Sequence, residues 1–145
     1  MKPVDQTIID EDKSNCMQAV LATLFEQKFE DTIDIYTYPE GEWLSPFMAW
    51  LESIGYEYQG VANMFVDPVD GATRQKARRD LCRFESIGGY FYGVVNSRRF
   101  ESVTHAVVID ALGVVVHDPN PGNAWLGVDT IATKELLHIY TFGII

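Results

Sequence analysis

A cysteine, a histidine and an aspartate in this sequence are placed so that together they could carry out nucleophilic catalysis. Cys16 lies at the start of a predicted helix, where the helix dipole and unsatisfied N–H groups favour a thiolate. His105 and Asp118 flank a predicted β-hairpin, and a carboxylate beside an imidazole orients it as a base. The thiol would then attack a carbonyl carbon, with backbone N–H groups and the side-chain amide of Gln6 or Asn15 as candidates to hold the oxyanion.

The hairpin between His105 and Asp118 supplies the geometric reason for pairing them. Two β-branched runs are separated by Asp110-Ala111-Leu112-Gly113, a turn-sized connection that ends in glycine. A two-residue loop would pair Asp110 with Gly113 and place His105 directly opposite Asp118. Such partners lie on one face of the sheet with Cβ atoms about 4.5 to 5.5 Å apart. A one-residue bulge would instead turn the two side chains to opposite faces.

Hydrophobic periodicity predicts three helices. The first has Ser14 as its N-cap and an apolar stripe that starts at Met17 and continues at i+3, i+4, i+7 and i+8. The second has Ser45 as its N-cap and stops at Gly55, and the third runs from Thr73 to Phe84. The residues predicted to be buried in the second helix are Phe47, Trp50, Leu51 and Ile54.

Aromatic and β-branched residues dominate the sequence after Gly88 and predict strands. Helices followed by strands indicate an α+β fold, in which an antiparallel sheet packs on the N-terminal helix that carries Cys16. No repeat or linker divides the chain, so residues 1–145 are interpreted as one domain, with a loop-rich wall from Tyr56 to Ala72. The predicted strands span residues 90–95, 105–109, 114–117 and 137–142.

Charge and apolar content exclude several classes of function. The net charge is -10 and its excess lies in residues 1–60, which disfavours nucleic acid as a partner. No apolar run is long enough to cross a bilayer and the N-terminus lacks a signal-peptide core, so we expect a cytoplasmic protein without membrane contact. The basic segment 74–83 is interpreted as a solvated helical face, with a docking patch for an acidic protein partner as the alternative.

Four short segments of the sequence resemble the papain-like cysteine peptidase superfamily, in the arrangement of the double-glycine leader peptidases. Small stand-alone bacterial and phage proteins look similar along nearly the whole chain. The resemblance implies a papain-like fold with Cys16 as nucleophile, His105 as base, Asp118 as the orienting acid and Gln6 as the oxyanion amide, and it implies no cofactor. The segments are Val4-Asp5-Gln6-Thr7, Asn15-Cys16-Met17-Gln18-Ala19, His105-Ala106-Val107-Val108 and His117-Asp118-Pro119.

These residues predict a cysteine hydrolase, a peptidase or isopeptidase, that acts on a peptide or protein substrate through a thioester. One alternative is a transglutaminase-like or deamidating acyl transferase, which the same triad would support. The other is a catalytically idle papain-like binding module, such as a phage-encoded inhibitor or a leader-peptide recognition domain.

Two further groups of residues are predicted not to react. A zinc site of Cys16, His105, His117 and His138 is disfavoured because no Cys-x-x-Cys or His-x-x-x-His pair is present. We therefore expect no metal. His117 and His138 are predicted to be non-catalytic and Cys82 to be structural, with both cysteines reduced.

Overall fold

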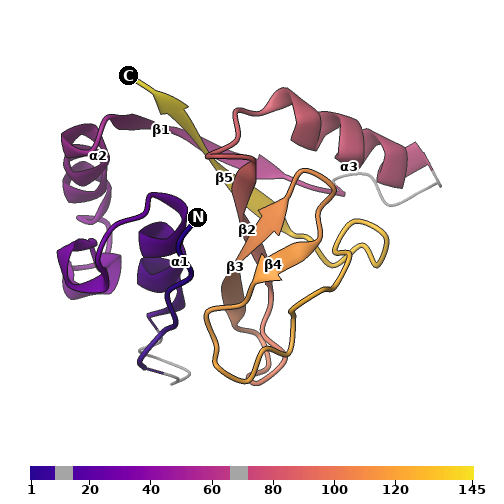
Figure 1. Ribbon diagram of the computed structural model, residues 1–145, viewed down its shortest axis with the longest axis horizontal. Helices are drawn as coiled ribbons and strands as arrows, with labels where there is room; N and C mark the ends of the chain where they lie inside the picture. The colour runs from indigo at the N-terminus through magenta and orange to yellow at the C-terminus, as the bar shows by residue number, and fades with distance from the viewer. Residues whose placement is uncertain (9–14, 66–71) are drawn as a thin grey trace.

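An antiparallel sheet with helices on both faces makes up the chain in a computed structural model, which describes residues 1–8, 15–65 and 72–145 (Figure 1). Within those residues the sheet has five strands in the order β1-β5-β2-β3-β4, and every neighbouring pair is antiparallel. The mixed α+β class predicted from the sequence is confirmed. The elements are α1 (Cys16–Leu24), the 3-10 turns η1 (Phe29–Asp31) and η2 (Ile35–Thr37), α2 (Leu44–Ser53), β1 (Tyr56–Asn63), α3 (Ala72–Arg83), β2 (Tyr90–Asn96), β3 (Thr104–Asp110), β4 (Val115–His117) and β5 (His138–Ile144).

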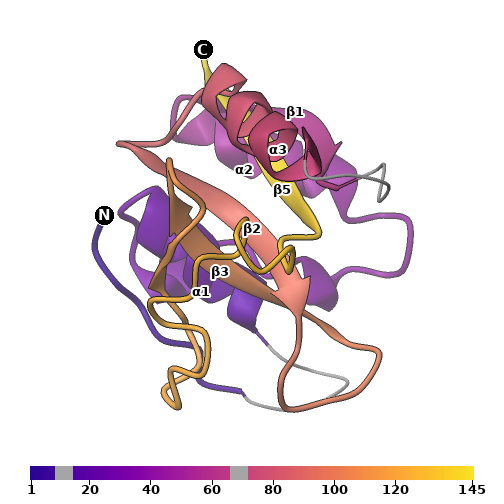
Figure 2. The ribbon, with the colours of Figure 1, turned by 90° about the vertical axis from the view of Figure 1, so that its right-hand side faces the viewer.

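Each face of the sheet carries its own hydrophobic core. Helices α1 and α2 lie on one face, and Figure 2 shows α3 in front of the sheet on the other. The first core joins Leu21 of α1, Phe47 of α2 and Phe142 of β5, whereas the second joins Leu81 of α3 to Ile109 of β3. No helix in the described part of the chain is long and apolar enough to span a bilayer.

The first two helices follow their predicted apolar stripes. Ser14 lies outside the described residues, and the N-cap of α1 is Asn15, without a side-chain capping bond. The N-cap of α2 is Trp43 rather than Ser45, because the helix begins one residue before the predicted cap. Of the four residues predicted to be buried, Phe47 and Leu51 are fully buried, whereas Trp50 and Ile54 are only partly buried. Helix α3 spans Ala72–Arg83 and agrees with the third predicted helix to within a residue.

Strand β1 corrects the prediction of a loop-rich wall between Tyr56 and Ala72. It pairs with β5 along its whole length, with a bulge between Tyr58 and Gly60. After this bulge the inward positions are the small residues Gly60 and Ala62, while the β-branched Val61 is exposed. The apolar alternation that indicates a strand is therefore absent from the second half of β1, which explains why periodicity missed it. Because β1 precedes α3, the chain also does not run simply from helices to strands.

The hairpin between β3 and β4 differs from the predicted register, although it brings together the predicted side chains. The backbone N–H of Asp110 donates to the carbonyl of Val114, so the loop has three residues rather than two. A bulge follows, because Ile109 pairs with Val115 but Val108 pairs with His117. The loop and the bulge each shift the pairing by one residue. Together they shift the register by two residues, which leaves each side chain on its predicted face of the sheet, whereas a shift of one residue would move it to the opposite face.

Gly113 is the loop position that the fold most strongly requires to be glycine. Its φ is +85°, and an added Cβ would lie 2.7 Å from two side-chain carbons of buried Ile131. We expect Gly113→Ala to lower the free energy of unfolding by about 3 kcal/mol, from backbone strain plus overpacking. The matched control is Gly127→Ala, since Gly127 has a φ of +82° and open space around it.

Gly127→Ala should lower the free energy of unfolding by about 1 kcal/mol, from backbone strain alone. Urea denaturation of both variants measures the two losses. Equal losses would show that Ile131 does not restrict this position.

Candidate active site

The first turn of α1 presents Cys16 to the sheet. Helix α1 packs on β2 and β3, and its buried stripe from Met17 to Leu24 fixes the rotation of the helix. Cys16 is only 8% exposed and is the first residue of the helix. N–H groups in the first helical turn point out of the helix end, so the surroundings of the sulfur favour negative charge.

His105 and Asp118 form the closest polar contact of the site. His105 is the second residue of β3, Asp118 directly follows β4, and the imidazole Nε2 lies 2.7 Å from Asp118 Oδ1. The carboxylate is 1% exposed and also accepts the backbone N–H groups of Asn120 and Trp125. Three donors therefore hold Asp118 in one position, and the carboxylate in turn fixes the imidazole.

The pKa values of this pair reflect their mutual contact. Burial lowers the pKa of His105, but hydrogen bonds with Asp118 and Cys16, together with the charges of both, raise it from 6.5 to about 9. Burial raises the pKa of Asp118, but the hydrogen bond and charge of His105 and the N–H groups of Trp125 and Asn120 hold it below its usual value. Because Nε2 faces Asp118, Nδ1 is the ring nitrogen that remains for the sulfur. An imidazolium thus lies between the sulfur of Cys16 and a carboxylate, and its charge favours the thiolate form of the sulfur.

The segment before α1 ties the helix to the end of β4. The backbone N–H of Val4 donates to Thr23 Oγ1 in α1, and the carbonyl of Val4 accepts a bond from His117 Nε2. The N–H of Gln6 donates to the carbonyl of Pro119, next to Asp118. This segment therefore helps to hold Cys16 and Asp118 at a fixed separation, and it gives His117 a structural role.

The two amides predicted to hold the oxyanion are both engaged near the start of α1. The Gln6 Nε2 donates to the carbonyl of Ile8, and the side chain is buried. The Asn15 Oδ1 accepts the N–H groups of Thr7 and Ile8, while its Nδ2 donates to Thr7 Oγ1. Neither side chain is among the described residues that line the cleft at Cys16.

Aromatic residues that the sequence did not single out line the cleft at Cys16. The cleft holds about 70 Å³ and includes both Cys16 and His105. Tyr92 of β2 and Tyr140 of β5 are directly paired, and their ring centroids are 4.6 Å apart. The remaining described lining residues that carry rings are Tyr36 of η2 and His138 of β5.

The rings around the sulfur carry no charge at neutral pH. Burial first, and then the charge of Cys16, raises the pKa of Tyr36, Tyr92 and Tyr140, so their hydroxyl groups stay protonated. Burial lowers the pKa of His138. The sequence offered little indication that these tyrosines line the site, because aromatic residues in strands ordinarily belong to the hydrophobic core. The walls of the cleft are therefore neutral donors, and the charge is concentrated on the Cys16, His105 and Asp118 set.

The remaining candidate residues lie apart from this cleft. Cys82 is exposed on α3, which lies across the sheet from α1, and its assignment as a structural, unreactive cysteine stays a prediction. Within the described residues neither cysteine forms a disulfide. In the basic segment, Lys76 and Arg83 pair with Asp80, and Arg78 pairs with Asp129. Among the described residues no three His, Cys, Asp or Glu side chains are grouped as metal ligands.

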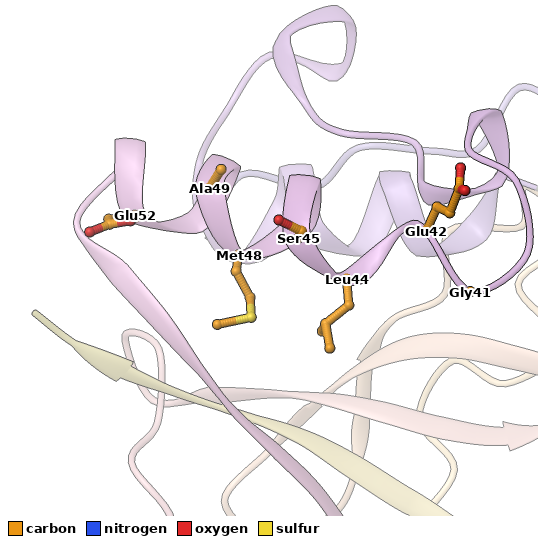
Figure 3. Close-up of a pocket in the computed structure, with 7 residues that line it drawn as sticks. All are labelled: Gly41, Glu42, Leu44, Ser45, Met48, Ala49 and Glu52. Carbon is orange, nitrogen blue, oxygen red and sulfur yellow. The ribbon is translucent and has the colours of Figure 1, made fainter.

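A second pocket, of about 460 Å³, lies on the outer face of α2. Leu44 and Met48 project from the same side of the helix there, with Glu42 and Glu52 at the rim (Figure 3). Its described lining contains no cysteine or histidine, so it offers neither a thiol nor an imidazole that could activate Ser45. The smaller cleft at Cys16 is therefore the candidate active site.

Comparison of the chain with protein-family models, with curated proteins and with solved structures finds no match. The interpretation of the site therefore rests on its own geometry. Three residues from α1, from β3 and from the segment after β4 are brought together, and they are the three selected from the sequence.

Proposed function

We propose that this chain is a cysteine-dependent amide hydrolase, a peptidase or isopeptidase, with Cys16 as nucleophile, His105 as base and Asp118 as the orienting acid. The observation that carries the proposal is the placement of His105. One ring nitrogen contacts a buried carboxylate at 2.7 Å, and the imidazole also bonds to a thiol at a helix start. A histidine between these two groups can hold a proton taken from sulfur and later release it.

The arrangement supports a two-step reaction. The thiolate of Cys16 attacks the carbonyl carbon, a C–S bond forms, and the carbonyl π electrons move to oxygen as an oxyanion. Backbone N–H groups in the first turn of α1, which carries the thiol, are the candidate donors to the oxyanion. The predicted side-chain donor, Gln6, instead gives its Nε2 to the carbonyl of Ile8 and is not among the described residues that line the cleft. The oxyanion collapses, the C–N bond breaks, and His105 protonates the departing amine. Water, deprotonated by His105, then cleaves the thioester and restores the thiol.

A papain-like architecture is part of the same proposal. In its support, a helix that starts with the cysteine packs on an antiparallel sheet, and the sheet supplies the histidine from one strand and the aspartate from the end of the next. The neutral, ring-lined cleft suits an uncharged acyl group next to the sulfur.

The alkylation rate of Cys16 against pH tests the proposal. In a Cys82→Ala background, we expect iodoacetamide to react rapidly already near about pH 6, well below the pKa of about 8.5 of a free thiol. The same protein in urea serves as the unfolded control. A rate that follows the unfolded control across the pH range would reject the hydrolase and favour a binding module.

Product mass separates the two enzymatic outcomes. A mixture of peptides is incubated with and without a primary amine as competing acceptor. Hydrolysis increases the summed product mass by one water, whereas acyl transfer gives an adduct with the amine.

A further inference from the structure

A third pocket adjoins the active site at His105. It holds about 280 Å³, and it shares His105 and Asp118 with the site but is not lined by Cys16. Arg98 and Arg99, which follow β2, form another part of its wall, and Trp125 closes it. The pocket therefore combines the catalytic base with two guanidinium groups.

The two arginines play different roles in this pocket. Arg98 is held in place, because its guanidinium carbon lies 3.8 Å from the Trp125 ring centroid and its Nη1 donates to the carbonyl of Ala124. Its charge is paired with Glu135 at 3.4 Å. Arg99 is exposed and has no carboxylate within ion-pair distance among the described residues, and its guanidinium lies 5.4 Å from the ring of Phe100.

The charges leave a local surplus of positive charge in an acidic chain. His105 and Asp118 offset each other, and Arg98 and Glu135 do the same. Arg99 is the remaining charge, whereas the whole chain carries -10. An exposed guanidinium in the wall of a pocket, without a carboxylate partner, attracts anions, and its planar donors match a carboxylate.

The chemistry of the site decides which part of a substrate would enter this pocket. His105 must protonate the departing nitrogen, so the leaving group lies on the His105 side of the sulfur. The pocket lies on that side, because it contains His105 and Asp118 but not Cys16. The acyl group occupies the ring-lined cleft instead.

We propose that Arg99 binds a carboxylate on the leaving-group side of the substrate, with Arg98 and Trp125 as the fixed wall behind it. This inference rests on the proposed hydrolase and narrows its substrates to amides whose departing amine carries a carboxylate. That carboxylate is either the C-terminus of a peptide or the side chain of an acidic residue. In both cases the group that Arg99 binds is a carboxylate anion.

Pairs of thiol-reactive probes that differ only in one charge test this role. N-iodoacetyl-glycine carries a C-terminal carboxylate and is compared with N-iodoacetyl-glycinamide. N-iodoacetyl-glutamic acid α-amide carries a side-chain carboxylate and is compared with N-iodoacetyl-glutaminamide. In a Cys82→Ala background at low salt, we expect the anionic member of at least one pair to alkylate Cys16 about tenfold faster than its neutral partner.

The matched variants are Arg99→Gln and Arg79→Gln, which remove the same charge from the pocket and from α3, respectively. Arg99→Gln should abolish the preference for the anion, and Arg79→Gln should retain it. The pair that shows the preference identifies the source of the carboxylate. Neutral probes reacting as fast as the anionic ones in both pairs, or a preference that survives Arg99→Gln, would overturn the proposal.

Failure of the hydrolase proposal has a different signature. Slow reaction of every neutral probe, at the rate of the unfolded protein, would reject an activated thiol, while the ratio within each pair would still report on Arg99. Activation of the thiol and binding of the anion are therefore measured separately in one experiment.

Discussion

Replacing His105 with alanine is expected to slow the reaction of Cys16 with iodoacetamide about thirtyfold at about pH 5, relative to the protein that retains His105. A thiol with a pKa of about 8.5 is ionised to only about 0.03% at this pH, whereas a thiolate held by an imidazolium is almost fully ionised. The ionised fraction thus differs by about 3,000-fold. A thiolate of low basicity is a weaker nucleophile by about a hundredfold, so the net difference in rate is about thirtyfold.

The shape of the pH profile provides a second readout. With His105 the rate should vary little from about pH 5 to pH 8, and without it the rate should rise about tenfold per pH unit up to the ordinary thiol pKa. His138→Ala is the matched control, because His138 lines the same cleft without a bond to Asp118. Parallel profiles for the two variants would show that His105 does not act on the thiol.

Replacing Asp118 with alanine is expected to cost about 3 kcal/mol of folding free energy, in addition to slowing alkylation of Cys16. The variant leaves the imidazole of His105 and the N–H groups of Asn120 and Trp125 without their shared acceptor in a buried place. Asp118→Asn keeps one oxygen, which can accept only one of the two N–H groups, because Asn120 donates to Oδ1 and Trp125 to Oδ2. It should therefore lose about 2 kcal/mol. The control is Asp129→Ala, because Asp129 is 39% exposed in its pair with Arg78.

The stability deficit of Asp118→Ala should depend on pH in a defined direction. The lowered pKa of Asp118 means that its stabilisation is present above the unfolded value of about 3.9 and is lost as the pH falls through the folded value. The pKa of His105 rises from 6.5 to about 9, so its stabilisation is complete below 6.5 and declines as the pH rises toward 9.

The deficit is therefore largest between about pH 4 and pH 6.5. Denaturation of both proteins in urea across this range measures it. A deficit that grew from pH 6.5 to pH 9 would contradict the ion pair.

Local sequence patterns located most of the elements that hold the site. The stripe that starts at Met17 predicted α1, and all of its members are buried against the sheet. The β-branched runs likewise predicted β2 and β3 to within one residue. The prediction of α1 succeeded because its apolar stripe recurs with the helical period. Strands β2 and β3 are buried on both faces, so they appear in the sequence as continuous apolar runs. Strand β1 was missed because its inward positions after the bulge are glycine and alanine.

The partnership of His105 and Asp118 was predicted from a register that the structure does not have. The three-residue loop that ends at Gly113 and the bulge after Val115 each moved the pairing by one residue, and the two shifts together preserved the face. The sequence held the signal for the loop, since Gly113 adopts a φ of +85° as glycine readily does. It held no comparable signal for the bulge.

The sequence by itself determined which side chains could react and which helix and strands would carry them, because these properties depend on residue type and local periodicity. Only the tertiary structure decided that Tyr92, Tyr140 and His138 line the cleft of the sulfur and that Arg99 lines a pocket together with His105. These neighbours come from strands and loops that are distant in the chain. Their proximity follows from the order β5-β2-β3-β4 and from the cores on the two faces of the sheet, which no local pattern encodes.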